Sequence, residues 1–470
     1  MERLSLSQIL FATNGRAVGF ERPDVGFDRV ATDSRTVQPG DVFWAIEGRT
    51  HDGHGFVSDA LARGAIASVV RHERAAAGRP AVVVDDTCQA LGRLAQWYRE
   101  GRDALVIGIT GSVGKTTTRE MVHAVLSARF RGTRSPRNFN NHIGVPLSIL
   151  DIEGGHEFAV LELAASAPGE IRQLAGIAQP EVGVVTAVGV SHLAGFGGYE
   201  KILEAKGELV EALPKTGFAV VPGDEPCASR LAARARCRVI RVGEAAENDV
   251  RAQRIHVDHD RLEWHVDGTR YRLRATGKHH VRAALTAIAI GREVDMAEYE
   301  IAQGLEAFVP APGRCQAQRI GPWTVIDDTY NANPSSMQAA CRALGDWNAT
   351  SHKLLVAADM LELGNDAAAY HRALGRSAAE AGIDHLLVHG DYARHVVAGA
   401  REAGLDGYRI AECENFEAML AVLDCWLEPG DVVLVKGSRA MRMERVVQWL
   451  RERTTSLNKE TPASALAPAC

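Results

Sequence analysis

The sequence lacks the features that mark several common classes of protein. Its eight cysteines are scattered and include no C-x-x-C pair, so they indicate neither a zinc site of that spacing nor a disulfide framework. No apolar run reaches the roughly 18 residues of a membrane span, and the amino terminus has no secretory signal pattern. A formal net charge of −6 gives no reason to expect nucleic acid. These absences predict a cytoplasmic protein with reduced thiols, no membrane span and no nucleic-acid partner.

The 470 residues suffice for about three domains, and the sequence pattern divides them. Residues 1–100 mix short strands and helices between glycines, which predicts a small α/β domain. Residues 101–313 alternate continuous apolar strands with helices, the pattern of a parallel sheet covered on both faces, with an antiparallel hairpin at 250–275. Residues 314–455 follow a proline- and glycine-rich hinge and predict a doubly wound, Rossmann-like domain. Residues 456–470 are polar and alanine-rich, so we expect a disordered tail.

The most informative stretch is residues 108–118, GITGSVGKTTT. An apolar, β-prone segment leads into glycines, then Lys-Thr-Thr, then a predicted helix. Glycines let backbone N–H groups close around phosphate oxygens, and the helix presents the positive end of its dipole. Lys115 can reach the β- and γ-phosphates, and the Thr116 hydroxyl can ligate Mg²⁺. The spacing is shorter than the eight-residue Walker pattern, because Ile109 stands where its first glycine would be. The predicted triphosphate-binding residues are Thr110, Gly111, Ser112, Gly114, Lys115, Thr116 and Thr117.

Three more residues in the second domain are candidates for metal chemistry. Glu162 ends the apolar strand 158–161, and a carboxylate at a strand end beside a phosphate loop commonly holds Mg²⁺. His192 lies in a loop after a predicted strand, where a lone histidine is more often structural. Lys206 lies on a predicted helix and could equally be an ordinary solvated lysine. The residues alone leave both possibilities open for each.

Other polar segments are candidates for ligand contact. Residues 138–146 carry three asparagines within four positions, which is denser than a capping turn needs and indicates recognition of a polar ligand. Residues 327–334, DDTYNANP, follow a strand of the third domain, where ligands of doubly wound folds bind, although a turn with a helix N-cap has the same composition. Residues 436–439, KGSR, follow another strand and suit an anionic group. Residues 33–35 form a polar loop in the first domain.

These motifs, in this order, resemble those of the Mur ligase family over about residues 27 to 450. The most specific are TGSVGKT, NFNNHIGVP, HLAGFGG with AKGE, DDTYNANP, DMLELG at 359–364 and VKGSR at 435–439. The YNANP and KGSR forms are those of the branch that adds D-alanyl-D-alanine. The D-N-P-R-like motif of the branch that adds the third residue is absent.

The resemblance implies an ATP-dependent amide ligase of peptidoglycan precursor synthesis. We expect the protein to be a monomer. The terminal carboxylate of UDP-N-acetylmuramoyl-tripeptide would attack the γ-phosphorus of ATP, and the amine of D-Ala-D-Ala would then attack the acyl phosphate. Two Mg²⁺ ions would neutralise charge on the transferring phosphoryl group. Thr116, Glu162 and His192 would hold Mg²⁺. Lys206 matches a lysine that the family carbamylates with CO₂, which turns a cation into a carboxylate-like ligand. Lys115, Lys206 and His192 are thus the implied catalytic residues.

The resemblance also implies further contacts with ATP and the substrates. Residues expected to meet the nucleotide from the third domain are Arg314, Asp328, Tyr330, Asn331 and Asn333. Residues expected to meet the substrates are Ser34 and Arg35 at the UDP end, Asn140 and Asn141 in the amide-rich segment, and Lys436, Ser438 and Arg439 at peptide or dipeptide carboxylates.

The sequence departs from the family pattern at several positions. Alanine replaces the usual glycine at Ala164 and Ala358, and the usual asparagine at Ala187. The G-x-H-N-x-x-N element, which touches adenine in the family, here reads GKHHVRA at 277–283, so both amides are missing and the base preference stays open. Two alternatives remain: another Mur-type or folylpolyglutamate-type ATP-dependent amide ligase, or a catalytically inactive nucleotide-binding protein.

Overall fold

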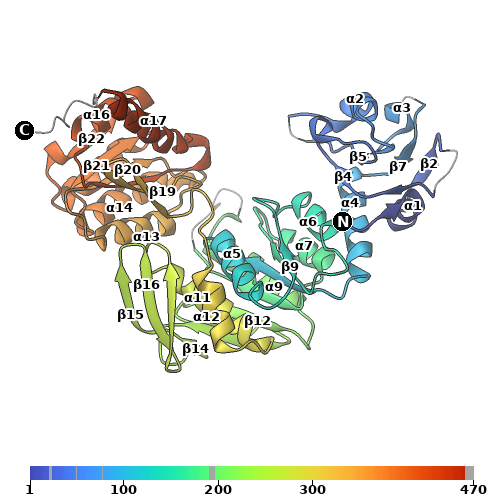
Figure 1. Cartoon of the computed structure of the whole chain (residues 1–470), viewed down its shortest axis with the longest axis horizontal. Coiled ribbons are helices and arrows are strands. Elements are labelled where there is room, and N and C mark those ends of the chain that lie inside the picture. The colour runs from blue at the N-terminus through green and yellow to red at the C-terminus, as the bar shows by residue number, and fades with distance from the viewer. Residues whose placement is uncertain (21–23, 49, 77, 190–195, 461–470) are drawn as a thin grey trace, which may run out of the picture.

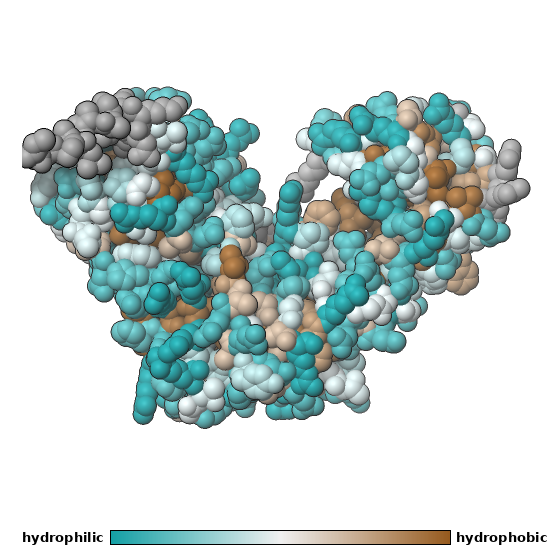
Figure 2. All heavy atoms as spheres, in the orientation of Figure 1, coloured by the Kyte–Doolittle hydropathy of each residue, from teal (hydrophilic) through white to brown (hydrophobic). Residues whose placement is uncertain are grey.

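The computed structural model describes residues 1–470 except 21–23, 49, 77, 190–195 and 461–470. The molecule is shaped like an open V, with an amino-terminal domain on one arm, a carboxy-terminal domain on the other, and a central domain joining them (Figure 1). Figure 2 shows an open notch between the two arms, above the central domain. The predicted three-domain α/β architecture is therefore confirmed.

The amino-terminal domain is a small five-stranded sheet with helices packed on it. Its strand order is β2-β7-β6-β5-β4, and only the β2–β7 pair is antiparallel. The strands are β2 (Arg16–Val18), β4 (Val30–Ala31), β5 (Val42–Trp44), β6 (Ala67–Val70) and β7 (Ala81–Val83), with β1 (Leu4–Ser5) and β3 (Gly26–Phe27) paired separately. The helices are α1 (Leu6–Thr13), α2 (Val57–Ala62), α3 (Glu73–Ala76) and α4 (Thr87–Glu100).

The central domain is a seven-stranded, all-parallel sheet in the order β14-β13-β12-β11-β8-β10-β9. Its middle strands are continuously apolar because helices cover both faces. The strands are β8 (Leu105–Thr110), β9 (Gly132–Arg134), β10 (Phe158–Glu162), β11 (Val182–Val185), β12 (Phe218–Pro222), β13 (Arg238–Gly243) and β14 (Val250–Arg251). The helices are α5 (Lys115–Leu126), α6 (Gly144–Leu150), α7 (Glu170–Ala178), α9 (Tyr199–Ala212), α10 (Ala228–Ala232), α11 (His280–Glu293) and α12 (Glu298–Glu306).

The hairpin expected at 250–275 is a three-stranded antiparallel sheet in the structure. Its strands are β15 (Gln253–Asp258), β16 (Arg261–Val266) and β17 (Thr269–Arg274). Alternate residues of β16 and β17 are buried, among them Trp264 and Tyr271, whose rings stack at 5.9 Å. This alternation is the sequence signal that predicted an antiparallel element.

The carboxy-terminal domain has a six-stranded sheet in the order β18-β19-β23-β20-β21-β22, parallel except for the edge strand β18. The strands are β18 (Gln316–Ile320), β19 (Trp323–Asp328), β20 (Lys353–Ala358), β21 (His385–His389), β22 (Ile410–Cys413) and β23 (Val432–Lys436). The helices are α13 (Pro334–Gly345), α14 (Ala367–Glu380), α15 (Ala393–Glu402), α16 (Phe416–Trp426) and α17 (Glu444–Glu460).

Three expectations from the sequence concern the carboxy-terminal segment, membrane-spanning helices and the cysteines. Helix α17 extends to Glu460, so it includes residues 456–460 of the segment expected to be a disordered tail; residues 461–470 lie outside the described part. Within the described residues, no helix combines the length and apolarity needed to cross a membrane. The seven cysteines of the described ranges are all free thiols, and four of them are buried.

Candidate active site

A cavity of about 1120 Å³ lies between the central and carboxy-terminal domains. One wall is formed by the loop after β8, the end of β10 and the start of α11, and the other by the segments after β19, β20 and β23 together with α13. All these strands contribute their carboxyl ends, which is where parallel sheets present ligand-binding loops. The carboxyl-end edges of the two sheets therefore both face this cavity.

The loop after β8 has the backbone geometry of a phosphate cradle. Gly111 and Gly114 have φ angles of +146° and +83°, which side-chain-bearing residues rarely adopt. A Cβ on Gly111 would lie 2.0 Å from the Thr186 hydroxyl, so no larger residue fits there. That hydroxyl donates to the Val113 carbonyl at 2.5 Å, and the Ser112 hydroxyl donates to the Gly189 carbonyl at 2.7 Å. The segment after β11 thus holds the loop in shape.

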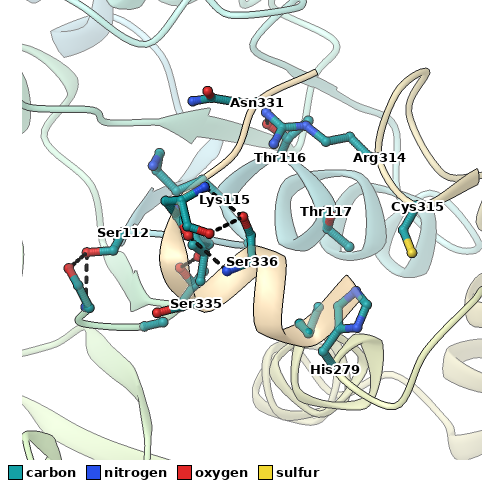
Figure 3. Close-up of a pocket in the computed structure, with 18 of the residues that line it drawn as sticks. Ser112, Lys115, Thr116, Thr117, His279, Arg314, Cys315, Asn331, Ser335 and Ser336 are labelled. Atoms are coloured by element: carbon teal, nitrogen blue, oxygen red, sulfur yellow. Dashed lines mark hydrogen bonds between the residues drawn. The ribbon is translucent and has the colours of Figure 1, made fainter. Parts of the chain in front are cut away.

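Helix α5 begins at this loop with an N-terminus open to ligand. Its N-cap is Gly114, which offers no side-chain cap, so the first amides of a twelve-residue helix are available to an anion. Lys115 is half-buried, and its ammonium donates to the Gly111 carbonyl at 2.6 Å. Burial lowers the pKa of Lys115, while Glu162 opposes the shift and Arg314 adds to it. Figure 3 shows Ser112 and Lys115 near the first turn of α13, at Ser335 and Ser336, and Thr116 beside Arg314.

Glu162 lies at the end of β10, beside the phosphate loop. Its carboxylate is buried and forms an ion pair with Arg119 of α5 at 2.8 Å. The other carboxylate oxygen accepts a hydrogen bond from the Asn140 amide at 3.4 Å. Glu162, Asn140 and Thr116 all line the cavity. The carboxylate and hydroxyl predicted to bind Mg²⁺ and one of the amides predicted to bind substrate therefore line the same cavity.

On the opposite wall, strand register brings together residues more than a hundred positions apart. Asp328 and Lys436 are register partners at the ends of β19 and β23. The buried Lys436 ammonium pairs with the Asp328 carboxylate at 2.7 Å and donates to the Asn331 carbonyl at 2.8 Å. Lys436 therefore reaches the cavity edge with its charge already compensated, which differs from the expectation that it faces a substrate carboxylate.

Arg314, at the hinge, spans both walls. Its guanidinium stacks on the Tyr330 ring, 3.9 Å from the centroid, and donates to the Thr116 hydroxyl at 3.4 Å. Arg439 approaches the same ring at 5.8 Å and is exposed. Asn333 caps α13 by accepting from the Ser336 amide at 2.9 Å, yet it also lines the cavity.

Several expected residues lie away from this cavity. Asn141 caps α6, because its side-chain oxygen accepts the amides of Ile143 and Gly144, so the capping alternative applies to it. Ser34 and Arg35 are in the amino-terminal domain, where the exposed Arg35 pairs with Asp33 at 2.7 Å. Thr110 is fully buried in β8. His192 falls outside the described residues.

Lys206 is buried on α9. Within the described residues its ammonium has no hydrogen bond or ion pair, and it lies 5.4 Å from the centre of the Phe196 ring. Burial, reinforced by the charge of Lys115, lowers its pKa to about 7. An ordinary solvated lysine is therefore excluded: about half of this amine is neutral at pH 7, the form that reacts as a nucleophile.

Several cavity residues escaped the sequence analysis. Ser335 and Ser336 of α13 and Cys315 after the hinge line the space only because the two domains pack together. His279 and the buried His280 lie at the start of α11 with their ring centroids 4.2 Å apart and their planes tilted by 39°, within the element already noted as unusual. Burial lowers the pKa of His280, so it is neutral at pH 7, and its Nδ1 lies 3.2 Å from the Gly277 carbonyl.

Comparisons with known proteins agree with this arrangement. Family models match residues 27–99 (Mur ligase family, catalytic domain), 109–291 (Mur ligase middle domain) and 313–439 (Mur ligase, glutamate ligase domain). The UDP-N-acetylmuramoyl-tripeptide–D-alanyl-D-alanine ligase of Bacillus subtilis is 34% identical over 430 residues, which cover 90% of this chain and 93% of that protein. The chain belongs to the Mur ligase family.

Solved structures of Mur ligases match the whole architecture. MurF from Acinetobacter baumannii superimposes with a TM-score of 0.89 at 31% identity, covering 96% of this chain and 99% of that one. The MurF ligase from Thermotoga maritima, solved in complex with ADP, gives a TM-score of 0.80 at 28% identity, covering 92% and 98%. The resemblance stated from the sequence is confirmed, and so is the ATP-dependent ligase class that it implied.

The departures from the Mur ligase pattern are accommodated by local packing. The amide of Ala164 donates to the Asn140 carbonyl at 2.8 Å, and the carbonyl of Ala187 accepts from the Ser112 amide at 2.9 Å. Both contacts use backbone atoms, so an alanine side chain serves at either position. A Cβ added to Gly437 would lie 2.9 Å from the Cβ of Ala358. Because Ala358 carries a side chain, position 437 in the KGSR loop has to be glycine.

Proposed function

We propose that this chain is the ATP-dependent ligase that joins D-alanyl-D-alanine to UDP-N-acetylmuramoyl-tripeptide in peptidoglycan precursor synthesis. The observation that carries the proposal is the cavity in which Lys115 and the open N-terminus of α5 face the KGSR loop of another domain. A phosphate-transfer site and a separate anion-facing loop in one space suit a reaction that activates an acid and then joins it to an amine. The full-length likeness to ligases of this name supports the substrate pair.

The proposed reaction has two steps. An oxygen of the tripeptide's terminal carboxylate attacks the γ-phosphorus of ATP, and the bond to ADP breaks. The amine of the dipeptide then attacks the carbonyl carbon of the acyl phosphate, loses a proton, and phosphate leaves with the bonding electrons. Lys115 and the first amides of α5 hold the β- and γ-phosphates, and the first step builds charge where these fixed donors already point. Closure between the domains excludes water, which would otherwise hydrolyse the acyl phosphate.

Mg²⁺ fits the polar groups beside the phosphate loop. The Thr116 hydroxyl and the buried Glu162 carboxylate are oxygen donors of the kind Mg²⁺ prefers, and both line the cavity next to Lys115. No cluster of three acidic, histidine or cysteine side chains suited to a metal occurs among the residues the structure describes. Thr116 and Glu162 would hold one ion, and His192 with a modified Lys206 would complete a second position. The ions supply charge neutralisation at the transferring phosphoryl group.

Carbamylation of Lys206 is part of the proposal. CO₂ adds to a neutral amine, and burial keeps the pKa of Lys206 at about 7, so a large share of this amine is neutral under physiological conditions. The carbamate replaces a buried cation with an anion able to ligate a metal. The structural reason for a lysine at this buried position is then its reactivity rather than its charge.

Substrate binding by the other arm completes the proposal. Ser34 and Arg35 would hold the UDP end; they belong to the amino-terminal domain, which a notch separates from the carboxy-terminal domain (Figure 2). Asn140 lies beside Glu162 and would contact the peptide end. A cytoplasmic location and a monomeric state stay predictions of the sequence.

The proposed function is tested by assaying phosphate release with ATP and Mg²⁺ against a matrix of substrates. UDP-MurNAc-tripeptide, with lysine or diaminopimelate in third place, or a folyl glutamate as the alternative acid, is combined with D-Ala-D-Ala or with L-glutamate. Amide product only with the dipeptide supports the proposal. Product only with glutamate would favour a folylpolyglutamate-type ligase, and nucleotide binding without product from any pair would favour an inactive binding protein.

A further inference from the structure

The loop that follows β20 is attached to the KGSR loop at two points. The Asp359 carbonyl accepts from the Ser438 amide at 3.1 Å, and the Leu361 amide donates to the Ser438 hydroxyl oxygen at 2.9 Å. Residues 359–361 therefore run alongside Ser438 like a short stretch of paired strand. The position of the Ser438 side chain depends on where this loop lies.

The middle residue of the same loop is held from the opposite side by His371 of α14. The Met360 amide donates to His371 Nε2 at 2.9 Å, and His371 Nδ1 lies 2.7 Å from the Ala367 carbonyl. A carbonyl only accepts, so Nδ1 carries the hydrogen and Nε2 keeps the lone pair that Met360 needs. His371 is 1% exposed, and burial lowers its pKa, so the ring is neutral.

The surroundings of His371 leave it little freedom. The Asp359 carboxylate accepts the amides of Asp391 and Tyr392 at 2.7 and 3.2 Å, and the Tyr392 ring stacks on the imidazole at 4.7 Å. A Cβ on Gly390 would lie 2.3 Å from that carboxylate, so the turn fits closely around it. The charged or titratable groups facing the ring are Asp359, with an oxygen 3.6 Å from Nε2, and His395.

This arrangement determines what Ser438 can offer to a ligand. Its oxygen already accepts from Leu361, and among the described residues its O–H has no acceptor, so the hydrogen is left for the cavity that Ser438 lines. The neighbouring Lys436 is neutralised by Asp328. The donors that the KGSR loop presents to a carboxylate are therefore the Ser438 hydroxyl and the exposed Arg439, whose guanidinium also lies 3.4 Å from a Glu444 carboxylate oxygen.

We infer that His371 is a positioning residue: through Met360 it fixes the loop that orients the Ser438 hydroxyl toward the carboxylate of the incoming dipeptide. This inference rests on the proposed function for the identity of that ligand. Neutral His371 acts as an acceptor of one backbone hydrogen bond, without touching substrate. Nothing else in the described part of the fold supplies the buried Met360 amide with an acceptor.

The kinetic test compares His371→Leu with His371→Gln. Leucine removes the acceptor, whereas the side-chain carbonyl of glutamine can replace Nε2. We expect His371→Leu to raise the KM for D-Ala-D-Ala at least fivefold while the KM for ATP changes less than twofold, and His371→Gln to restore the dipeptide KM to within twofold. His389→Leu is the matched control, because among the described residues this half-buried histidine of β21 bonds only the Cys413 carbonyl and lies outside the cavity. Equal rises of both KM values, or no rescue by glutamine, would overturn the inference.

A second measurement separates this inference from the proposed function. Amide hydrogen exchange at Met360 and Leu361 needs no substrate. We expect exchange at both amides to speed up at least tenfold in His371→Leu and to stay near the original rate in His371→Gln. Unchanged exchange in His371→Leu overturns the positioning role whatever the substrate. If exchange behaves as expected but the unmodified protein makes no amide from the dipeptide, the proposed function fails and the role of His371 in orienting Ser438 stands.

Discussion

Arg314 and Thr116 join the carboxy-terminal domain to the phosphate loop: the guanidinium donates to the threonine hydroxyl at 3.4 Å while stacking on Tyr330. The same hydroxyl is the group expected to ligate Mg²⁺. One residue at the hinge therefore contacts both the carboxy-terminal domain and the start of the helix after the phosphate loop. We expect this contact to couple the relative position of the two domains to nucleotide binding.

Replacing Arg314 should weaken that coupling. We expect Arg314→Ala to lower kcat/KM for ATP by about tenfold to a hundredfold, since a charge-assisted hydrogen bond and a cation–π contact are lost together. Arg314→Lys should recover only part of the loss, because an ammonium lacks the planar fork that stacks and donates at once. Steady-state kinetics at saturating second substrates measures both.

The control is Arg319→Ala, an exposed arginine of β18 that bonds only the Gly321 carbonyl within the part of the chain that the structure describes. It should leave kcat/KM for ATP unchanged. An Arg314→Ala protein as active as the control would show that the hinge contact has no part in nucleotide use.

Lys115 should be indispensable for turnover. Lys115→Ala removes the fixed cation closest to the transferring phosphoryl group, and losses of about a hundredfold to a thousandfold in kcat are typical for such groups. The comparison is Lys215→Ala, an exposed lysine before β12. Phosphate release measures both variants, and a Lys115→Ala protein within threefold of the control would contradict the assigned role.

Glu162 should set the requirement for magnesium. Glu162→Gln keeps the shape but removes the charge, so we expect the Mg²⁺ concentration for half-maximal activity to rise about tenfold or more. Glu157→Gln, just before the other end of β10, bonds only the Arg131 amide and serves as control. An unchanged magnesium requirement in Glu162→Gln would place the ion elsewhere.

Lys206 should make activity depend on CO₂. We expect activity to fall in CO₂-depleted buffer and to return with bicarbonate, and Lys206→Ala to lose most turnover and regain part of it with added short carboxylates. The mutant tests the role of the side chain, and the bicarbonate response tests the modification. Full activity of Lys206→Ala would reject the carbamate.

The same lysine predicts a pH effect on stability in CO₂-depleted buffer. Its pKa is about 7 in the folded protein, against an ordinary value of 10.5, so the unfolded chain binds more protons between these limits. The contribution of Lys206 to the free energy of unfolding therefore rises with pH across this window and is constant below it. Denaturant titrations at pH 7 and pH 9 should show this rise, and Lys206→Met should reduce it. An identical pH dependence in both proteins would contradict the lowered pKa.

The sequence predicted what local pattern controls. An apolar strand, two glycines in left-handed or extended positive-φ conformations and a helix start define the phosphate loop within a dozen residues. The capping role of Asn141 could not be separated from the cavity-lining position of its neighbour Asn140, because both occur in the same amide-rich turn. The spacing of the asparagines indicates a polar turn, but it does not predict which amide side chain faces the ligand.

What the sequence could not predict depends on distant parts of the chain. The Lys436 ammonium forms an ion pair with Asp328 because β23 lies between β19 and β20 in the sheet. No local sequence signal predicts that these strands are neighbours. Ser335 and Cys315 reach the cavity by domain packing, and His371 acts from a helix that carries no motif. The burial that shifts the pKa of Lys206 likewise arises only when α9 packs on the sheet.

The central claim is that the peptide acid is activated by direct transfer of the γ-phosphoryl group to its carboxylate. The most direct test labels the terminal carboxylate of UDP-MurNAc-tripeptide with ¹⁸O and follows the label by mass spectrometry. The account predicts one ¹⁸O atom in each phosphate released, matched by one amide bond formed. Phosphate free of label, with amide still formed, would contradict it.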